Sequence, residues 1–107
     1  MRRPPRFAII YAPETVDHLH TVERKYHRLI RSTVKEQLGH TPDRATRNRK
    51  PLDPPMPFGA IWEVRFGPKN RFRVFYEIDS NVFSVSVLAV GIKEGNRLLI
   101  GREEFTP

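Results

Sequence analysis

Residues Gly59–Tyr76 read GAIWEVRFGPKNRFRVFY, and this stretch decides the fold that we expect for the chain. Apolar residues recur at every second position on both sides of Gly67–Asn70, a segment with the composition of a tight turn. Because side chains alternate between the two faces of a strand, this pattern predicts a β-hairpin with one apolar face. The residues expected on that face are Trp62, Val64, Phe66, Phe72, Val74 and Tyr76.

The polar face of the predicted hairpin carries an unusual number of guanidinium groups for a small sheet. If the two arms pair, Glu63, Arg65, Arg71 and Arg73 come together on one exposed surface. This surface either binds an anionic ligand or is a solvated sheet face that keeps the protein soluble. The alternation alone favours neither interpretation.

Length and composition limit the kind of protein this is. A chain of 107 residues has the size of one domain, so we expect a single domain over residues 1–107 with a loose N-terminal arm at residues 1–5. The absence of cysteine excludes disulfides, thiolate metal sites and cysteine nucleophiles. The apolar run Phe7–Ala12 is too short for a signal-peptide core or a membrane span, and we expect a soluble, cytoplasmic protein.

The positive charge is concentrated in the first half of the chain. The formal net charge is +7; residues 1–50 hold 12 Lys and Arg against 5 Asp and Glu, whereas residues 51–107 hold 7 of each. Such asymmetry predicts a polyanionic partner, which is either a nucleic acid or an acidic protein.

Strands and helices are expected on both sides of the hairpin. Residues Arg6–Tyr11 predict a strand, and apolar spacings of three and four from Pro13 to Leu38 predict two helices with a break near residues 20–24. After the hairpin, Val82–Val90 predicts a third strand that ends at Gly91, followed by a short apolar element at residues 98–100. Three strands joined by short turns make an antiparallel meander.

Residues 43–58 form a basic, proline-rich loop in this interpretation. Four cations, Arg44, Arg47, Arg49 and Lys50, fall within seven positions. Prolines make the loop extended and stiff, so it can hold phosphates at little cost in entropy. The alternative is a disordered linker. Three apolar residues that could anchor the segment to the core argue against it: Leu52, Met56 and Phe58.

The order of these elements, together with particular residues, resembles the RelE/ParE superfamily of toxins from bacterial type II toxin–antitoxin systems, and most of all its RelE-like and HigB-like branch. The residues that carry the resemblance are Arg49–Leu52, Gly59, Ile61–Phe66, Arg71–Tyr76 and Leu88–Lys93. The resemblance implies an α+β fold of the RelE-like microbial RNase type. In that fold an N-terminal strand and a two-helix hairpin pack on an antiparallel sheet (β-α-α-β-β-β) with a short C-terminal element, and the other sheet face is open.

The resemblance also implies an activity and partners. RelE-like toxins enter the ribosomal A site and cut translated mRNA by attack of a 2′-hydroxyl on its own phosphate, which inhibits translation. This chemistry needs a proton acceptor, cations that hold the phosphorane charge and a proton donor, but no metal. The implied protein is a metal-independent endoribonuclease, an mRNA interferase. Its expected partners are a cognate, acidic antitoxin, the ribosome and mRNA; neither a cofactor nor a membrane is expected.

Site residues follow from the resemblance position by position. Arg73 matches the arginine of the second meander strand that contacts the scissile phosphate, and Arg65 matches a basic residue of the preceding strand. Lys93 falls where RelE has a further catalytic arginine, and Lys50 falls where some relatives have an acid/base residue. With Glu63, these are the catalytic candidates. The RNA-binding candidates are Arg47, Arg49, Arg71 and Arg97. The four histidines are expected to be surface residues and not metal ligands.

Two departures from the RelE pattern bear on the activity. Glu63 stands where RelE has a lysine, and it is either a general base or only the ion-pair partner of the arginines. Leu99 stands where RelE has the tyrosine that stacks on a base. The chemistry is then redistributed to Glu63, Lys50 or Arg47, or the protein is an inactive, toxin-like binding protein. A third alternative is a ParE-like inhibitor of DNA gyrase, against which the pair Arg65 and Arg73 argues.

Overall fold

The structure is a computed structural model that describes residues 6–105. Its elements, in chain order, are β1 (Ala8–Tyr11), α1 (Glu14–His20), the 3-10 turn η1 (Arg24–Tyr26), α2 (His27–Leu38), β2 (Arg49–Pro51), β3 (Trp62–Phe66), the 3-10 turn η2 (Pro68–Asn70), β4 (Phe72–Asp79), β5 (Ser84–Glu94), β6 (Arg97–Ile100) and β7 (Glu103–Phe105). The loose arm predicted at residues 1–5 lies outside the described residues. None of the helices within residues 6–105 is long and apolar enough to cross a membrane.

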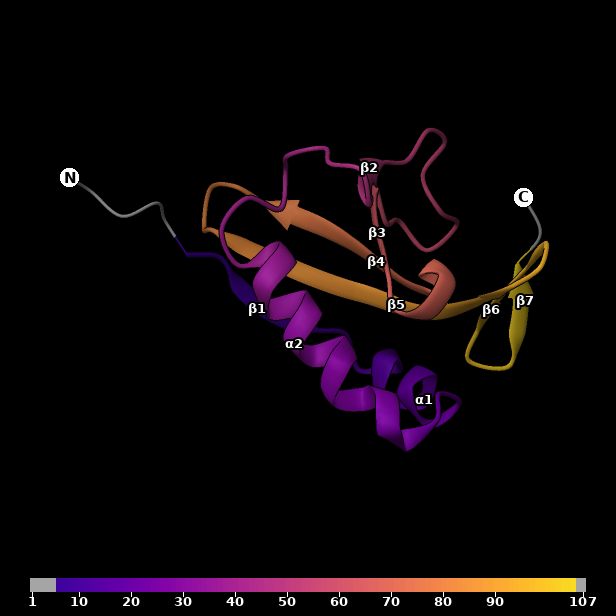
Figure 1. The fold of residues 1–107 in the computed structure, drawn as a ribbon. Helices are drawn as coiled ribbons and strands as arrows, with labels where there is room; N and C mark the ends of the chain where they lie inside the picture. Colours follow the sequence, from indigo (N-terminus) through magenta and orange to yellow (C-terminus); the bar gives the residue numbers. More distant parts are fainter. Residues whose placement is uncertain (1–5, 106–107) are drawn as a thin grey trace.

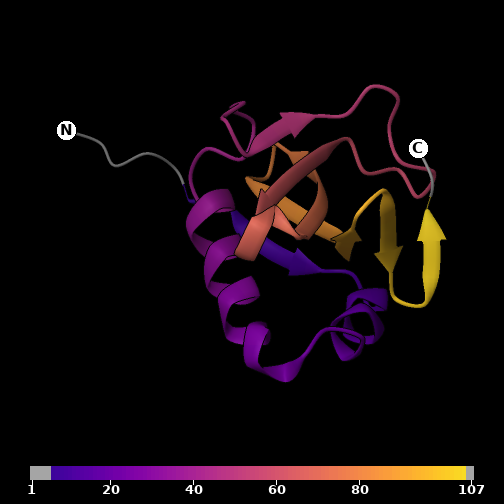
Figure 2. The ribbon, with the colours of Figure 1, turned by 45° about the vertical axis from the view of Figure 1, so that its right-hand side comes forward.

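A single sheet organises the fold. Its strands run in the order β2-β3-β4-β5-β6-β7 with antiparallel neighbours, and β1 pairs in parallel with the first half of β5. The second half of β5 pairs with β6. Both helices lie on one side of this sheet, and β6 and β7 lie at the end away from β1 (Figure 1, Figure 2). The prediction of a strand, two helices and an antiparallel meander is therefore confirmed.

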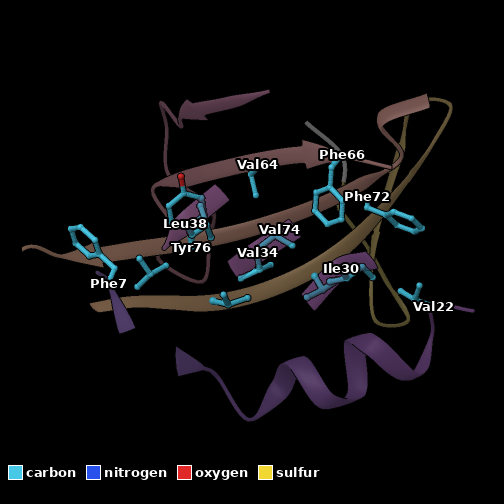
Figure 3. Packing of buried hydrophobic residues seen from close by; sticks show 13 residues of the cluster. Phe7, Val22, Ile30, Val34, Leu38, Val64, Phe66, Phe72, Val74 and Tyr76 are labelled. Carbon is cyan, nitrogen blue, oxygen red and sulfur yellow. The ribbon is translucent and has the colours of Figure 1, made fainter. Parts of the chain in front are cut away.

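The core fills the space between α2 and the sheet. Ile30, Val34 and Leu38 lie four residues apart on one face of α2, and all three are fully buried. They pack against the apolar face of the hairpin, including Val64, Phe72, Val74 and Tyr76 (Figure 3). The apolar face that the alternation predicts is thus the face that the helices cover.

The third strand of the meander differs from its prediction. It begins at Ser84, because Phe83 has a positive φ of 50° and lies in the turn, and it continues through Gly91 to Glu94. Gly91 does not end the strand; it pairs with Arg73 on one side and Ile100 on the other. A register shift between Phe75 and Tyr76 also interrupts the alternation, so Ala89 lies on the face opposite Val85.

The basic loop is more ordered than an extended connection. Residues 49–51 form the edge strand β2, which pairs with β3, and the part of the loop after β2 folds over the sheet face away from the helices. Leu52, Met56 and Phe58 pack there against a second cluster that includes Phe75 and Ala89. The anchoring residues are confirmed, and the linker interpretation is wrong for this segment. The sheet face opposite the helices is consequently not open along its whole length.

Candidate functional site

Arg65 and Arg73 stand directly opposite each other on β3 and β4. Both belong to the sheet face away from the helices, because Val64, next to Arg65, and Val74, next to Arg73, face the core. Two like charges at directly paired positions repel each other. Such a pair is stable only if another group compensates the charge.

Glu63 provides that compensation. Its Oε1 accepts a hydrogen bond from Nη1 of Arg73 at 2.8 Å and lies 3.4 Å from Nε of Arg65. Nε of Arg73 also donates to the carbonyl of Asn70 at 3.2 Å. One carboxylate between two guanidinium groups leaves a net charge of +1 in this triad. The expectation of an exposed Glu63 is wrong: the residue is only 5% exposed.

The triad lies in a hollow of ≈ 250 Å³ on the sheet face away from the helices. Its charged lining residues are Glu63, Arg65, Arg73 and Lys93. Its apolar lining residues come from the loop, β4, β6 and β7: Leu52, Met56, Pro57, Phe75, Leu98 and Phe105. The charged lining residues come from β3, β4 and β5, and the apolar lining residues, here called the apolar wall, come from the loop, β4, β6 and β7.

Two lysines from the sequence prediction lie near the triad. Lys93 lines the hollow, and its backbone N–H donates to the carbonyl of Arg71 at 2.7 Å. Lys50 pairs with Glu63 across β2 and β3, so both belong to the same sheet face, and Lys50 is exposed. The arrangement brings four of the five catalytic candidates into one hollow, and the fifth, Lys50, lies on the same sheet face beside Glu63.

Arg49 belongs elsewhere, which corrects its assignment as an RNA-binding residue. It pairs with Val64 and so turns toward the helix side, where it is 4% exposed. Its guanidinium donates to the carbonyls of Gln37 and Arg44. Gln37 is in the last turn of α2, where carbonyls lack helical partners. Arg49 thus ties β2 to the end of α2 and is not free to contact a ligand.

The other RNA-binding candidates lie outside the hollow. Arg71 precedes β4, lies 3.7 Å from Glu94 and packs over the ring of Phe72, so it does not share the surface of Arg65 as expected. Arg97 forms a surface ion pair with Glu104 at 2.9 Å. Arg47 is exposed in the loop before β2.

His18 differs from the surface position that was expected for all four histidines. Its Nδ1 accepts a hydrogen bond from the Val90 N–H at 3.3 Å, and the residue is half-buried. Burial lowers the pKa of His18, and the negative charges of Glu14, Asp17 and Glu103 partly oppose this shift. Among residues 6–105 no three His, Asp or Glu side chains gather as a metal site.

Sequence reasoning missed the apolar wall. Leu99, the position matched to a base-stacking tyrosine, pairs with Ile92, which packs against the core on the helix side. Leu98 and Phe105 line the hollow instead. The wall is formed by contacts between β6, β7 and the loop, and no local pattern in the sequence predicts contacts between such distant segments. The aromatic ring of Phe105 was the one available signal.

Comparisons with known proteins show a similarity of structure. No protein-family profile matches the chain, and no curated protein matches it significantly. A chain in the crystal structure of the RelBE2 toxin–antitoxin complex from Mycobacterium tuberculosis is similar, with a TM-score of 0.65 and 19% sequence identity over 82% of this chain and 99% of that chain. At this identity the similarity concerns the fold, and it confirms the predicted RelE-like α+β architecture.

Proposed function

We propose that this protein is a single-domain, cytoplasmic toxin of a type II toxin–antitoxin system, of the RelE-like and HigB-like branch, and that it acts as a ribosome-dependent mRNA interferase. One observation carries the proposal: Arg65 and Arg73 are held side by side by the buried Glu63 within a hollow. The fold similarity to a chain of a toxin–antitoxin complex supports it.

The proposed reaction is transfer of a phosphodiester within RNA. The 2′-oxygen forms a bond to phosphorus and the bond from phosphorus to the 5′-oxygen breaks, which leaves a 2′,3′-cyclic phosphate and a 5′-hydroxyl. The hydroxyl proton passes to a base, and the leaving 5′-oxygen receives a proton from an acid. Negative charge grows on the phosphate oxygens, where fixed cations stabilise the transition state.

Arg65 and Arg73 hold these phosphate oxygens in the proposed mechanism. A guanidinium is always charged and binds phosphate oxygens two at a time, and Glu63 engages only part of each donor set. Lys93 adds a third cation from β5. The triad is built before the substrate arrives, so little reorganisation is needed during the reaction.

Two groups are candidates for the proton acceptor, Glu63 and Lys50. The ion pairs of Glu63 favour a positioning role, because its Oε1 already accepts a hydrogen bond from Arg73 and lies close to the guanidinium of Arg65. Glu63→Gln keeps an oxygen for Arg73 but cannot take a proton. Unchanged ribosome-dependent cleavage by Glu63→Gln removes Glu63 from the proton transfer and leaves Lys50, which Lys50→Ala then tests.

The proposed protein partner is an acidic antitoxin segment. A hollow of ≈ 560 Å³ between β1 and α2 has mainly apolar lining residues together with Arg6, Arg31 and Lys35, and no acidic residue is among them. Together with the net charge of +7, this lining suits a segment that combines apolar and acidic side chains. A small neighbouring gene for a DNA-binding protein with an acidic tail is the expected genetic context.

Controlled expression in bacteria separates the proposed function from its rivals. An mRNA interferase stops translation first and leaves mRNA cut within codons. A gyrase inhibitor stops DNA synthesis first, and an inactive binding protein stops neither. Arg73→Ala is expected to relieve the arrest, whereas Arg28→Ala, an exposed substitution on α2, is expected to leave it intact. Arrest that persists in Arg73→Ala contradicts the proposal.

A further inference from the structure

A second cavity lies between α1 and the turn that joins β6 to β7, and the proposed reaction does not use it. Its volume is ≈ 570 Å³, which is within the roughly 300–1,000 Å³ of pockets that bind small molecules. One part of its lining comes from α1 and another from residues 101–103. These two elements lie beside each other in both views of the ribbon (Figure 1, Figure 2). The cavity is thus formed by segments far apart in the sequence.

Part of the lining is apolar and held in place by packing. Ala89 and Ile100 are 1% and 5% exposed and belong to the second hydrophobic cluster. Leu88, Phe58 and Phe105 pack against that cluster and also line the cavity. The rings of Phe58 and Phe105 meet edge-on with centroids 6.0 Å apart. This surface suits the methylene groups of a ligand.

The rest of the lining is mainly anionic. Glu14 and Asp17 are three residues apart on α1 and therefore share a helix face, and Glu103 comes from β7. None of the three carboxylates forms an ion pair within residues 6–105. Arg102 adds one positive charge and His18 is neutral at its lowered pKa. Three carboxylates and one guanidinium leave the lining with a net charge of −2.

This sign is opposite to that of the whole chain, whose formal net charge is +7. Charges separated by more than about 8 Å are largely screened at physiological ionic strength, so the charges of the lining decide which ligand enters. The carboxylates do not converge on one ion, because among residues 6–105 no three His, Asp or Glu side chains gather as a metal site. Separated negative charges around an apolar surface fit an organic ligand with separated positive charges.

We propose that this cavity binds a small aliphatic diamine or polyamine, with its methylene groups on the apolar lining and its ammonium groups on the carboxylates of α1 and β7. Each ammonium then has a carboxylate from a different element, and the chain between them covers Leu88 and the two phenylalanine rings. The site is separate from the triad, and the proposal does not depend on the proposed function.

A titration followed by ¹⁵N NMR of the full-length protein tests the proposal with three ligands of similar length. The ligands are 1,4-diaminobutane, butylammonium with a single charge, and uncharged 1,4-butanediol. We expect 1,4-diaminobutane to shift the amide signals of His18, Val90, Gly101 and Glu103, and 1,4-butanediol to leave them in place. Butylammonium should bind about 1.5- to 5-fold more weakly than 1,4-diaminobutane, because it lacks one exposed ion pair.

Charge-removing variants of similar side-chain size assign the carboxylates. Glu103→Gln and Asp17→Asn are each expected to weaken binding of 1,4-diaminobutane by about 1.5- to 5-fold, and the double variant by more than either alone. The matched control is Glu77→Gln, which removes the same charge at an exposed position on β4 that does not line the cavity. It should bind 1,4-diaminobutane as the wild-type protein does.

Four results would overturn the proposal. The first is the absence of shifts with 1,4-diaminobutane, and the second is equal shifts at acidic surface residues outside the cavity, such as Glu77 and Asp79. The third is equal affinity for butylammonium, which would show that the second ammonium has no partner. The fourth is unchanged affinity in both Glu103→Gln and Asp17→Asn. None of these results bears on cleavage of RNA, so the proposed function stands or falls separately.

Discussion

Glu63 is the residue on which the candidate site depends most. It lies between two arginines that repel each other, and it is only 5% exposed. The alternation in Gly59–Tyr76 predicted that Glu63, Arg65 and Arg73 share a face. It could not predict that Glu63 is buried, because burial depends on segments outside the hairpin, such as β2, whose Lys50 pairs with Glu63.

Removing this carboxylate is expected to destabilise the protein. Breaking a fully buried ion pair costs about 3–5 kcal/mol. Because the Arg65 side chain is 36% exposed and water screens its charge, we expect Glu63→Ala to cost less, about 1–3 kcal/mol. Glu63→Gln, which keeps an acceptor for Arg73, should cost less than Glu63→Ala. Midpoints of urea unfolding measure both, with the exposed Glu77→Ala as the control.

If Glu63→Ala unfolds at the same urea concentration as the wild-type protein, the arginines do not need their shared partner, and the interpretation of Glu63 as the residue that holds them is wrong.

Among the elements, β2 shows that a basic residue can stabilise the fold and not bind a ligand. Arg49 and Lys50 are neighbours in a run of cations, and composition alone gives them the same role. Pairing with β3 separates them: Arg49 faces the end of α2 and Lys50 faces the site. The sequence contains no local signal for a three-residue edge strand. The run of cations therefore predicted a phosphate-binding loop at this position.

This separation predicts different effects for two arginines of the loop. Arg49→Ala leaves the carbonyls of Gln37 and Arg44 without their donor, and an unsatisfied buried group costs about 1–3 kcal/mol. Arg47→Ala, at an exposed position, is expected to change stability by no more than about 0.5 kcal/mol. Thermal and urea unfolding compare the two variants. Equal stability of both would show that Arg49 is not the tie between β2 and α2.

His18 fills a gap between two elements that pair with β5. Residues 84–87 of β5 pair with β1 and residues 91–94 pair with β6, which leaves Leu88–Val90 without a strand neighbour on that edge. The imidazole of His18, on α1, accepts the Val90 N–H in this gap. Only the neutral ring can accept this hydrogen bond, in agreement with the lowered pKa of His18.

Stability is therefore expected to fall as the pH falls through about 6.5, the pKa of histidine in an unfolded chain. Burial lowers the pKa of His18 in the folded protein, so in this range the unfolded chain binds more protons, and the loss levels off below the folded pKa. His18→Asn retains an acceptor that does not titrate. Urea midpoints measured from pH 7.5 to pH 5 should fall less in His18→Asn than in the wild-type protein, and an equal fall would contradict this role for His18.

For the whole molecule, the sheet separates the main core from the proposed catalytic site. The helix side holds the main core, and the other side holds the triad and the apolar wall. The sequence predicted the helices and the meander, because those follow from periodicity within short segments, and the family resemblance implied the fold class. It did not predict β7, the register shift in β5 or the apolar wall, because these depend on contacts between distant segments.

Cleavage of ribosome-bound mRNA in a purified translation system tests the central claim most directly. With a defined codon in the A site, the wild-type protein is expected to cut the mRNA within that codon and leave a 2′,3′-cyclic phosphate. Loss of one charge-stabilising donor commonly costs about 10²- to 10³-fold in rate, so Arg73→Ala should cut at least about 100-fold more slowly. Arg28→Ala should cut at the wild-type rate. Intact mRNA with the wild-type protein, or equal cleavage by Arg73→Ala, would contradict the account.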